Sequence, residues 1–256
     1  MAQIKANEAL VKALQTWNID HLYGIPGDSV DAVVDSLRTV RDQFKFYHVR
    51  HEEAASLAAA SYTKMTGKIG VALSIGGPGI VHLLNGMYDA KMDNVPQLII
   101  AGQTNSTLLG TKFFQETNIS KMVDDVAVYH HQIQKGDNVF EITNEAIRTA
   151  YEKKGVSVII CPNDLLTQKI KDTTNRAVDT TKPKPVSPKF KSIKKAAKLI
   201  DKAKKPVMLI GLGTQHAKDE LREFIEAAKI PVIHTLPAKT ILPDDHPYSI
   251  GNLGKI

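Results

Sequence analysis

The chain has 256 residues, of which 43% are hydrophobic and 23% are charged. This composition excludes intrinsic disorder and is sufficient to bury one or two hydrophobic cores. No apolar run approaches the roughly 18 to 20 residues that a membrane span needs, and the N-terminus has no secretory signal pattern, so we expect a cytoplasmic protein. The single cysteine, Cys161, excludes an intramolecular disulfide and a CxxC redox pair.

The net charge of +6 comes from one basic stretch. Residues 166–205 hold 13 Lys or Arg and 3 Asp or Glu, whereas the rest of the chain holds 20 basic and 24 acidic residues. Three prolines between residues 180 and 188 oppose helix and central-strand formation there. Because Phe190 is the one aromatic residue of the basic stretch, a nucleic-acid-binding arm is disfavoured. We predict a basic, Pro-rich, solvated linker over residues 179–192.

The first domain alternates helical periods with short apolar runs. Apolar residues recur at three- and four-residue steps from Ala6 to Trp17, which predicts a helix. Continuous apolar runs are typical of strands buried on both faces of a parallel sheet. Strands are predicted at 21–24, 46–49, 71–75, 98–101 and 156–160, with helices near 29–39, 53–66, 79–92 and 138–153. We therefore predict an α/β fold with a doubly wound, six-stranded parallel sheet over residues 1–178.

The second domain is predicted to be incomplete. After the linker the pattern predicts, in order, a helix, a strand, a helix and a strand, at 193–203, 207–210, 217–228 and 232–234. Two strands with one crossover are too few to bury both faces of a sheet. We expect residues 193–256 to be a truncated second α/β domain whose remainder lies elsewhere.

Ligands in α/β proteins bind at the carboxyl ends of the strands, and two candidate sites follow the first strands. In the turn Gly27-Asp28-Ser29, either Asp28 or Ser29 is placed to cap the next helix. Glu52 opens an alanine-rich helix, where a carboxyl group turned towards the sheet would be desolvated and suited to share a proton with a ligand nitrogen. The alternative is that Glu52 and Glu53 only complement the helix dipole. A zinc-binding HExxH motif is excluded, because position 55 is alanine.

A glycine-rich turn and a long loop are two further candidates. The turn Gly76-Gly77-Pro78-Gly79 lacks the spacing of known phosphate-binding loops, so we interpret its glycines as letting a flat ring approach the backbone. His82 follows on the next helix, where a lone histidine is more often a core residue than a ligand. Phe114 and Gln115 lie in a long loop after a strand, and loops of this length are often functional.

Taken together, these motifs carry a resemblance to a known family. The segments YGIPGDS, RHEEAA, GGPGIVHLLNGMYDAKMDNVPQLIIAGQ, FFQE and GVSVIICPNDL resemble the pyrimidine-binding domain of thiamine-diphosphate enzymes of the pyruvate oxidase and acetolactate synthase group. The resemblance covers essentially all of residues 1–170. Residues 204–254 are similar to the first half of the group's central domain, which in the oxidases holds FAD. The segment 82–86 is most similar to quinone-linked, acetate-forming bacterial pyruvate oxidases.

The resemblance implies a reaction and a set of site residues. The implied reaction is oxidative decarboxylation of pyruvate to acetate or acetyl phosphate, with carbon dioxide release and with electrons passing from the thiamine enamine to FAD and on to quinone or oxygen. Glu52 would contact N1′ of the aminopyrimidine, with Gly77, Pro78 and His82 beside that ring. The substrate would lie near Phe114 and Gln115 and would face Gly27, Asp28 and Ser29. The matching flavin positions are Gly211, Gly213, Thr214, Thr235 and Lys239.

The resemblance also implies parts that lie outside this sequence. The family holds the diphosphate and Mg2+ through a Gly-Asp-Gly motif in a third domain, and this chain has no such motif. We therefore expect the chain to be inactive alone, and the full-length protein to be a homodimer or homotetramer that could contact the inner membrane face. An acetolactate synthase-type carboligase and a non-catalytic binding fragment remain as alternatives.

Overall fold

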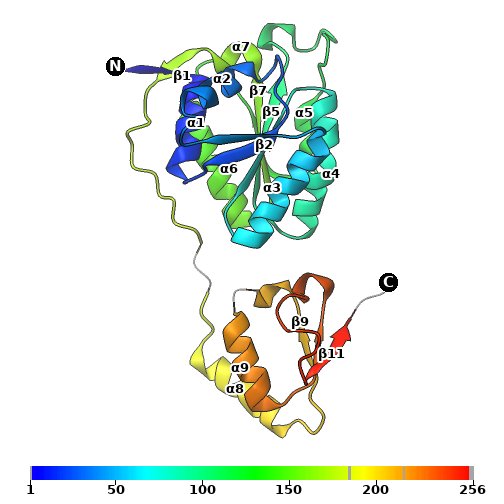
Figure 1. The fold of residues 1–256 in the computed structure, drawn as a ribbon. Helices are drawn as coiled ribbons and strands as arrows, with labels where there is room; N and C mark the ends of the chain where they lie inside the picture. Colours follow the sequence, from blue (N-terminus) through cyan, green and yellow to red (C-terminus); the bar gives the residue numbers. More distant parts are fainter. Residues whose placement is uncertain (1, 184–185, 216, 254–256) are drawn as a thin grey trace. The chain divides into compact units, whose positions relative to one another are not determined.

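The computed structural model describes residues 2–183, 186–215 and 217–253, and the chain divides into two compact units (Figure 1). The first unit is Met1–Lys184 and the second is Pro185–Ile256. No helix in the described part of the chain has the length and hydropathy of a membrane-spanning segment.

The first unit is built on a six-stranded parallel sheet with strand order β3-β2-β4-β5-β7-β6. Its strands are β2 (His21–Gly24), β3 (Lys45–His48), β4 (Gly70–Ser74), β5 (Gln97–Gln103), β6 (Ala127–Gln132) and β7 (Val156–Pro162). One face is covered by α1 (Ala6–Thr16), α2 (Asp31–Thr39) and α6 (Val139–Lys153), and the other by α3 (Glu52–Thr66), α4 (Pro78–Met92) and α5 (Ile119–Val123) (Figure 1). The predicted doubly wound α/β fold is confirmed.

Short elements complete this unit. The strands β1 (Gln3–Lys5) and β8 (Lys169–Lys171) form a separate antiparallel pair. The helix η1 (Ser106–Leu108) lies in the long loop after β5, and α7 (Asn163–Leu166) follows β7 directly. The pair β1–β8 joins the start of the unit to the segment that leaves it.

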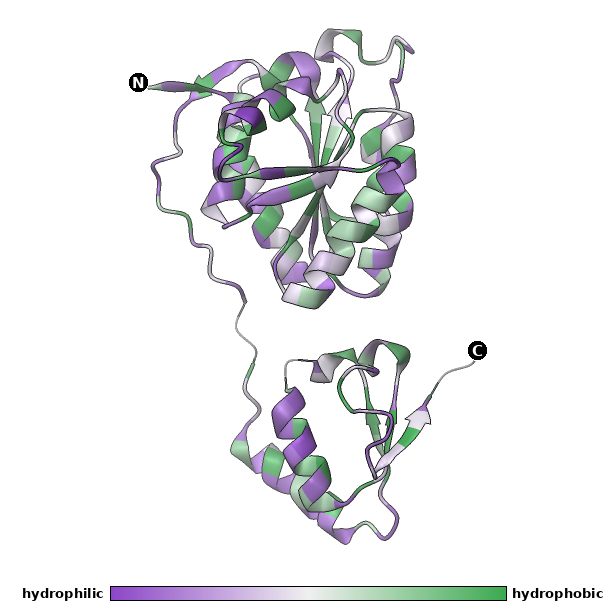
Figure 2. Cartoon of the chain, viewed as in Figure 1, coloured by the Kyte–Doolittle hydropathy of each residue, from purple (hydrophilic) through white to green (hydrophobic). Residues whose placement is uncertain are grey.

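The central strands are buried on both faces, as their continuous apolar runs predict. In β4, Val71 and Leu73 pack in the core shared with α1 and α6, whereas Ala72 packs in the core shared with α3 and α4. This split follows from the alternation of side chains along a strand. The hydrophobic colouring in Figure 2 is accordingly concentrated on the central strands and on the helix faces against them.

Besides β1 and β8, two strands of the parallel sheets occur where the sequence analysis named none. The sixth strand of the large sheet, β6, is an edge strand whose residues are all partly exposed and include His130 and His131. The second unit has three parallel strands instead of the predicted two, in the order β11-β10-β9. The additional strand β11 (Ser249–Asn252) has only partly or fully exposed residues. Neither segment contains the apolar run on which the prediction relied.

The remaining elements of the second unit lie close to their predicted positions. They are α8 (Phe190–Lys202), β9 (Met208–Ile210), η2 (Leu212–Thr214), α9 (Lys218–Ala228), β10 (Val232–His234) and η3 (Leu236–Ala238). Their small core is formed by six buried residues: Ile210, Ile225, Val232, Ala238, Ile241 and Leu242.

Candidate functional site

The carboxyl ends of three neighbouring strands bring the candidate residues to one edge of the first unit's sheet. Gly24 of β2 pairs with Leu73 of β4, and Ser74 of β4 pairs with Ala101 of β5. Because these strands are parallel, the segments that follow them emerge side by side. The turn after β2, the glycine turn after β4 and the loop after β5 therefore meet at this edge.

Glu52 is placed by the first turn of α3. It belongs to the buried stripe of that helix, together with Ser56, Ala59 and Thr63, which recur at helical spacing. Glu52 is 8% exposed, whereas Glu53 is turned outward and accepts a hydrogen bond from the side chain of Asn85. The two carboxyl groups both lie in the first turn of α3, but they have different environments, because only Glu52 is buried. Its chemical role stays a prediction.

His82 contacts Glu52 from the neighbouring helix. Its Nδ1 lies 2.8 Å from Oε2 of Glu52, and its side chain is 42% exposed. The interpretation of His82 as a core histidine is therefore wrong. The His82 ring also stacks on His51, the N-cap of α3, with ring centroids 4.3 Å apart. One nitrogen or oxygen from each of these three residues lies within 4.8 Å of the others, a donor set that a transition metal could also use.

The glycine turn before α4 packs directly on the loop after β5. Gly77 has φ of +61°, and a Cβ at this position would lie 2.8 Å from the carbonyl oxygen of Gln115. Gln115 itself has φ of +62°, which is uncommon for a residue with a side chain. Pro78 then occupies the first turn of α4, where a backbone N–H has no partner within the helix, so proline loses no hydrogen bond there. The glycine turn and Gln115 therefore fix each other's position.

Four of the predicted substrate-side residues line one pocket of about 170 Å³ beside this turn. They are Asp28, Ser29, Phe114 and Gln115, and the remaining lining residues are Gly76, Gln103, Thr104, Asn105, Leu108, Phe113 and Asn163. Sequence reasoning gave no role to Gln103, Asn105 or Asn163. Two of these residues could have been found from the sequence, because polar residues at the carboxyl ends of strands are candidates for ligand binding. Gln103 ends strand β5, and Asn163 directly follows β7.

The structure corrects the predicted helix cap in the turn after β2. The helix α2 begins at Asp31, and Val30 takes the N-cap position instead of Asp28 or Ser29. The Asp28 carboxylate accepts a hydrogen bond from the Ser29 N–H at 2.8 Å, and the Ser29 hydroxyl accepts one from the Gly76 N–H at 3.1 Å. Both side chains therefore face the pocket edge rather than the helix end. Gly27, from the same predicted set, packs against Ile75, and a Cβ there would lie 2.5 Å from that side chain.

Hydrogen bonds hold the loop after β5 in place around this pocket. The Glu116 carboxylate accepts from the N–H groups of Gly110 and Phe113, at 2.5 and 3.2 Å. These bonds, that from Gly110 first, hold the pKa of Glu116 below its usual value. The Gln103 amide donates to the Thr117 carbonyl at 2.8 Å, which anchors the end of the loop. Phe114, 74% exposed, is thus held at the pocket rim.

The predicted flavin residues lie at the carboxyl edge of the second unit's sheet. Gly211 follows β9 and Thr235 follows β10, and a Cβ on Gly211 would lie 3.8 Å from the Thr235 hydroxyl. The Thr214 hydroxyl donates to the Gly211 carbonyl at 2.7 Å, whereas a Cβ on Gly213 would meet nothing within 4 Å. Lys239 lies 3.6 Å from the carboxylate of Asp244. His216, which breaks the GxGxxG spacing, lies outside the described residues. The flavin assignment stays a prediction.

Comparison with known proteins agrees with this architecture. Residues 4–122 match the family described as "Thiamine pyrophosphate enzyme, N-terminal TPP binding domain", and residues 193–256 match "Thiamine pyrophosphate enzyme, central domain". The chain therefore carries two regions that are similar to the N-terminal and central domains of thiamine pyrophosphate enzymes. The candidate site of Glu52 and His82 lies in the first of these regions, and the predicted flavin residues lie in the second.

Three curated relatives align along nearly the whole chain. YdaP of Bacillus subtilis (strain 168) is 47% identical over 256 residues, which are 100% of this chain and 45% of YdaP. A pyruvate oxidase of Lactiplantibacillus plantarum is 37% identical over 255 residues, 99% of this chain and 42% of that protein. An acetolactate synthase of Mycobacterium leprae is 33% identical over 256 residues, 98% of this chain and 41% of that protein. The chain thus spans less than half the length of these relatives.

Proposed function

We propose that Glu52, His82 and the Gly77 turn bind the aminopyrimidine ring of thiamine diphosphate. We further propose that the native protein oxidatively decarboxylates pyruvate to acetate or acetyl phosphate and carbon dioxide. The observation that carries this proposal is the buried Glu52 carboxylate, which contacts His82 of α4, the helix that the glycine turn begins. A small polar pocket lies at the same edge of the sheet. The relative named pyruvate oxidase supports the choice of reaction.

The residues present fit a flat, nitrogen-containing ring. Glu52 offers a carboxyl group that can hold or release a proton at a ring nitrogen, and its burial strengthens such a hydrogen bond. The His82 ring holds one carboxylate oxygen at 2.8 Å and so orients the group. Gly76 and Gly77 present backbone without side chains at the adjoining turn. When bound, thiamine diphosphate supplies a carbon nucleophile and an electron acceptor for loss of carbon dioxide.

The pocket beside the turn suits a small keto acid. Its volume of about 170 Å³ is below the ~300 Å³ at which pockets for drug-sized ligands begin. The Ser29 hydroxyl and the Gln115 amide supply polar groups at this pocket, and Phe114 at its rim can restrict the access of water. We assign Gly27, Asp28, Ser29, Phe114 and Gln115 to substrate positioning.

The proposal extends to further cofactors and partners. Five residues of this chain would hold FAD, namely Gly211, Gly213, Thr214, Thr235 and Lys239, and FAD would supply an acceptor for two electrons, with quinone or oxygen as the final acceptor. Mg2+ would be held by ligands outside this chain. We propose a homodimer or homotetramer as the working assembly, since the family resemblance implies a site shared between two subunits. The relative named acetolactate synthase motivates a carboligase as the competing reaction.

The test is pyruvate turnover by the native gene product that carries this chain, with the variants Glu52→Gln and Glu53→Gln as a matched pair. Both changes remove one carboxylate from the same helical turn, and only Glu52 is buried against His82. We expect Glu52→Gln to lower kcat by roughly 10²-fold or more, the usual contribution of a positioned acid or base, and Glu53→Gln to stay within about threefold.

Product analysis distinguishes the two reactions. Acetate or acetyl phosphate with flavin reduction supports the oxidase, whereas acetolactate without net flavin reduction would identify a carboligase. Turnover that survives Glu52→Gln unchanged would overturn the role of Glu52. Robust turnover by the isolated 256-residue chain would contradict the expectation that the diphosphate and Mg2+ are held elsewhere.

A further inference from the structure

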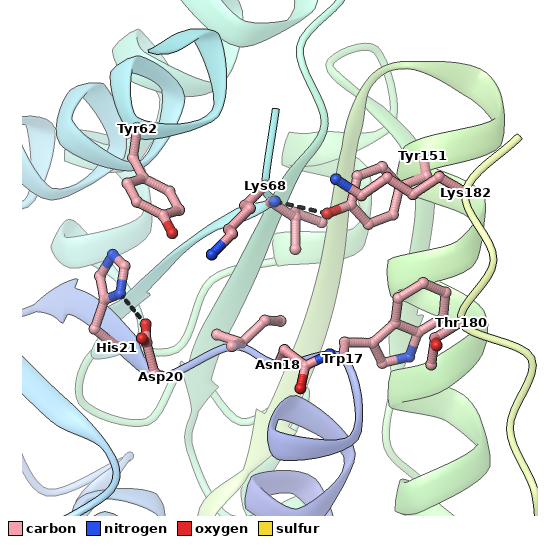
Figure 3. A pocket seen from close by; sticks show the side chains of 11 residues that line it. Trp17, Asn18, Asp20, His21, Tyr62, Lys68, Tyr151, Thr180 and Lys182 are labelled. Carbon is pink, nitrogen blue, oxygen red and sulfur yellow. Dashed lines mark hydrogen bonds and ion pairs between the residues drawn. The ribbon is translucent and has the colours of Figure 1, made fainter. Parts of the chain in front are cut away.

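A second pocket, of about 160 Å³, lies at the amino ends of β2 and β4, at the end of the sheet opposite the candidate site (Figure 3). We name it the amino-end pocket. It is lined by Trp17, Asn18, Ile19, Asp20, His21, Tyr62, Lys68, Ile69, Tyr151, Thr180 and Lys182. All of these residues belong to the first unit.

The amino-end pocket is remote from Glu52. The helix α3 carries Glu52 at its first residue and Tyr62 ten residues later, a separation of ~15 Å along the helix axis. A molecule in the amino-end pocket therefore touches neither Glu52 nor the pocket at Gln115. Whatever binds there acts as a structural ligand or effector and not as a reactant.

Two lysines from different segments of the chain line this pocket. Lys68 precedes β4, and Lys182 comes from the segment that leaves the unit. The Lys182 ammonium donates to the Gly67 carbonyl at 2.5 Å and lies 5.0 Å from the centroid of the Tyr151 ring. Burial, followed by the nearby Lys68 charge, lowers the pKa of Lys182. Both lysines line the same pocket, so an anion bound in it would offset the repulsion between their charges.

The other charges of the pocket leave the two lysines in excess. Asp20 is the acidic lining residue, and its carboxylate lies 2.6 Å from Nδ1 of His21. That hydrogen bond, together with the charges of His21 and Lys68, lowers the pKa of Asp20 and keeps it ionised. One carboxylate engaged with His21 faces two ammonium groups, so a bound ligand of negative charge is favoured.

The walls of the pocket are fixed before any ligand enters. The Tyr151 hydroxyl accepts a hydrogen bond from the Ile69 N–H at 2.8 Å, and the Trp17 ring stacks on Tyr151 with centroids 5.8 Å apart. The Trp17 N–H donates to the Asn144 side chain at 2.8 Å. Figure 3 shows the Lys68 ammonium and the Tyr62 hydroxyl directed into the same space, between the Asp20–His21 pair and Tyr151. Both groups can donate hydrogen bonds to an oxyanion.

We propose that the amino-end pocket binds a phosphate group between Lys68 and Lys182, and that this binding fastens the segment containing Thr180 and Lys182 to the first unit. A phosphate dianion matches two ammonium groups and offers acceptors for charge-assisted hydrogen bonds. Each lysine has three N–H donors, so Lys182 keeps two after its bond to Gly67. The volume suits inorganic phosphate or a compact phosphate monoester, and the pocket is smaller than those of ~300 Å³ or more that hold drug-sized molecules.

The site carries its own spectroscopic probe, because Trp17 is the single tryptophan of the chain. The experiment titrates the 256-residue chain with inorganic phosphate at constant ionic strength and follows Trp17 emission. A parallel arm uses glycerol phosphate, a compact monoester, and a third uses chloride alone. Saturable change with phosphate identifies the free ion as a ligand, tighter binding of glycerol phosphate identifies the monoester, and an equal response to chloride would overturn the proposal.

Charge-removing variants test the assigned residues. Lys68→Met and Lys182→Met keep the apolar side-chain stems and should each weaken phosphate binding tenfold or more, since each removes a charge-assisted hydrogen bond. Lys121→Met, at an exposed position of α5, is the matched control and should bind as the unchanged chain does. Equal affinity in all three variants would overturn the assignment.

Hydrogen exchange tests the fastening of the segment independently of the variants. Phosphate should slow amide exchange at residues 180–182 in the unchanged chain. Exchange that is unaffected at saturating phosphate would refute the fastening, even if Trp17 responds. The Glu52→Gln variant should bind phosphate normally, which separates this site from the proposed thiamine site.

Discussion

Replacing Gly86 by alanine should force apart the two helices that hold Glu52 and His82 together. A Cβ at Gly86 of α4 would lie 2.5 Å from the Ser56 Cβ and 2.6 Å from the Leu57 backbone nitrogen of α3. At a solvent-exposed position within a helix, replacing glycine by alanine raises the free energy of unfolding by ~1 kcal/mol. At a position that is already closely packed, an added methyl group lowers it by ~1–3 kcal/mol. Because one contacted atom is backbone, the upper part of that range applies, and we expect a net loss of ~1–2 kcal/mol.

Urea unfolding followed by Trp17 emission measures this loss, since the single tryptophan reports the first unit. The matched control is the double variant Gly86→Ala with Ser56→Gly, which removes the Ser56 atoms that the new methyl group meets. The double variant should lose less stability than the sum of the losses measured for Gly86→Ala and Ser56→Gly separately. His82 lies one turn before Gly86, so the single variant should also weaken the Glu52–His82 contact. A Gly86→Ala chain as stable as the original would refute the close contact between α3 and α4.

Three further outcomes follow from buried or hydrogen-bonded groups. Burial raises the pKa of Cys161 to about 12, so the thiol of the folded chain should resist disulfide reagents. The free energy of unfolding should fall as pH rises above about 9, because the unfolded thiol ionises there and the folded one does not. The variant Cys161→Ala should lack this pH-dependent fall. Backbone N–H groups lower the pKa of Glu116, so its stabilisation of the loop is present above its ordinary value of 4.5 and is lost as pH falls through the folded value. The protection of the amides of residues 110–116 against exchange, relative to the unfolded chain at the same pH, should fall there, as it should in Glu116→Gln at neutral pH. Asn144→Ala leaves the Trp17 N–H without its partner and should cost ~1–3 kcal/mol in urea unfolding, and an unchanged midpoint would contradict the importance of that bond.

The sequence predicts the strands that are buried on both faces. β4, β5 and β7 are fully buried, and a strand of this kind is mostly apolar, which leaves a short apolar run in the sequence. β6 and β11 carry no such run, because an edge strand needs only one partner and tolerates polar side chains. Their pairing depends on the neighbouring strand, which no local pattern describes. The centre of the large sheet could therefore be predicted, together with the edge strands β3 and β9, whereas the edge strands β6 and β11 could not.

The inward orientation of Glu52 was also present in the sequence. Small residues at positions 55, 56, 59, 60 and 63 mark the buried stripe of α3, and Glu52 lies on the same stripe, whereas Glu53 lies off it. Helical phase alone therefore separates the two glutamates. The partner of Glu52 could not be inferred in this way, because His82 lies on another helix, thirty residues later.

The loop at the candidate site marks the limit of local inference. Gln115 adopts a positive φ against Gly77, and neither residue signals the other in the sequence. The conformation of Gln115 is sustained by contacts on both sides of it: the Glu116 carboxylate holds the loop backbone, and Gln103 ties Thr117 to the end of β5. A strained residue persists only when such surroundings fix it, and strain of this kind concentrates at functional sites. The geometry of Gln115 is therefore an argument for its role that only the folded chain could provide.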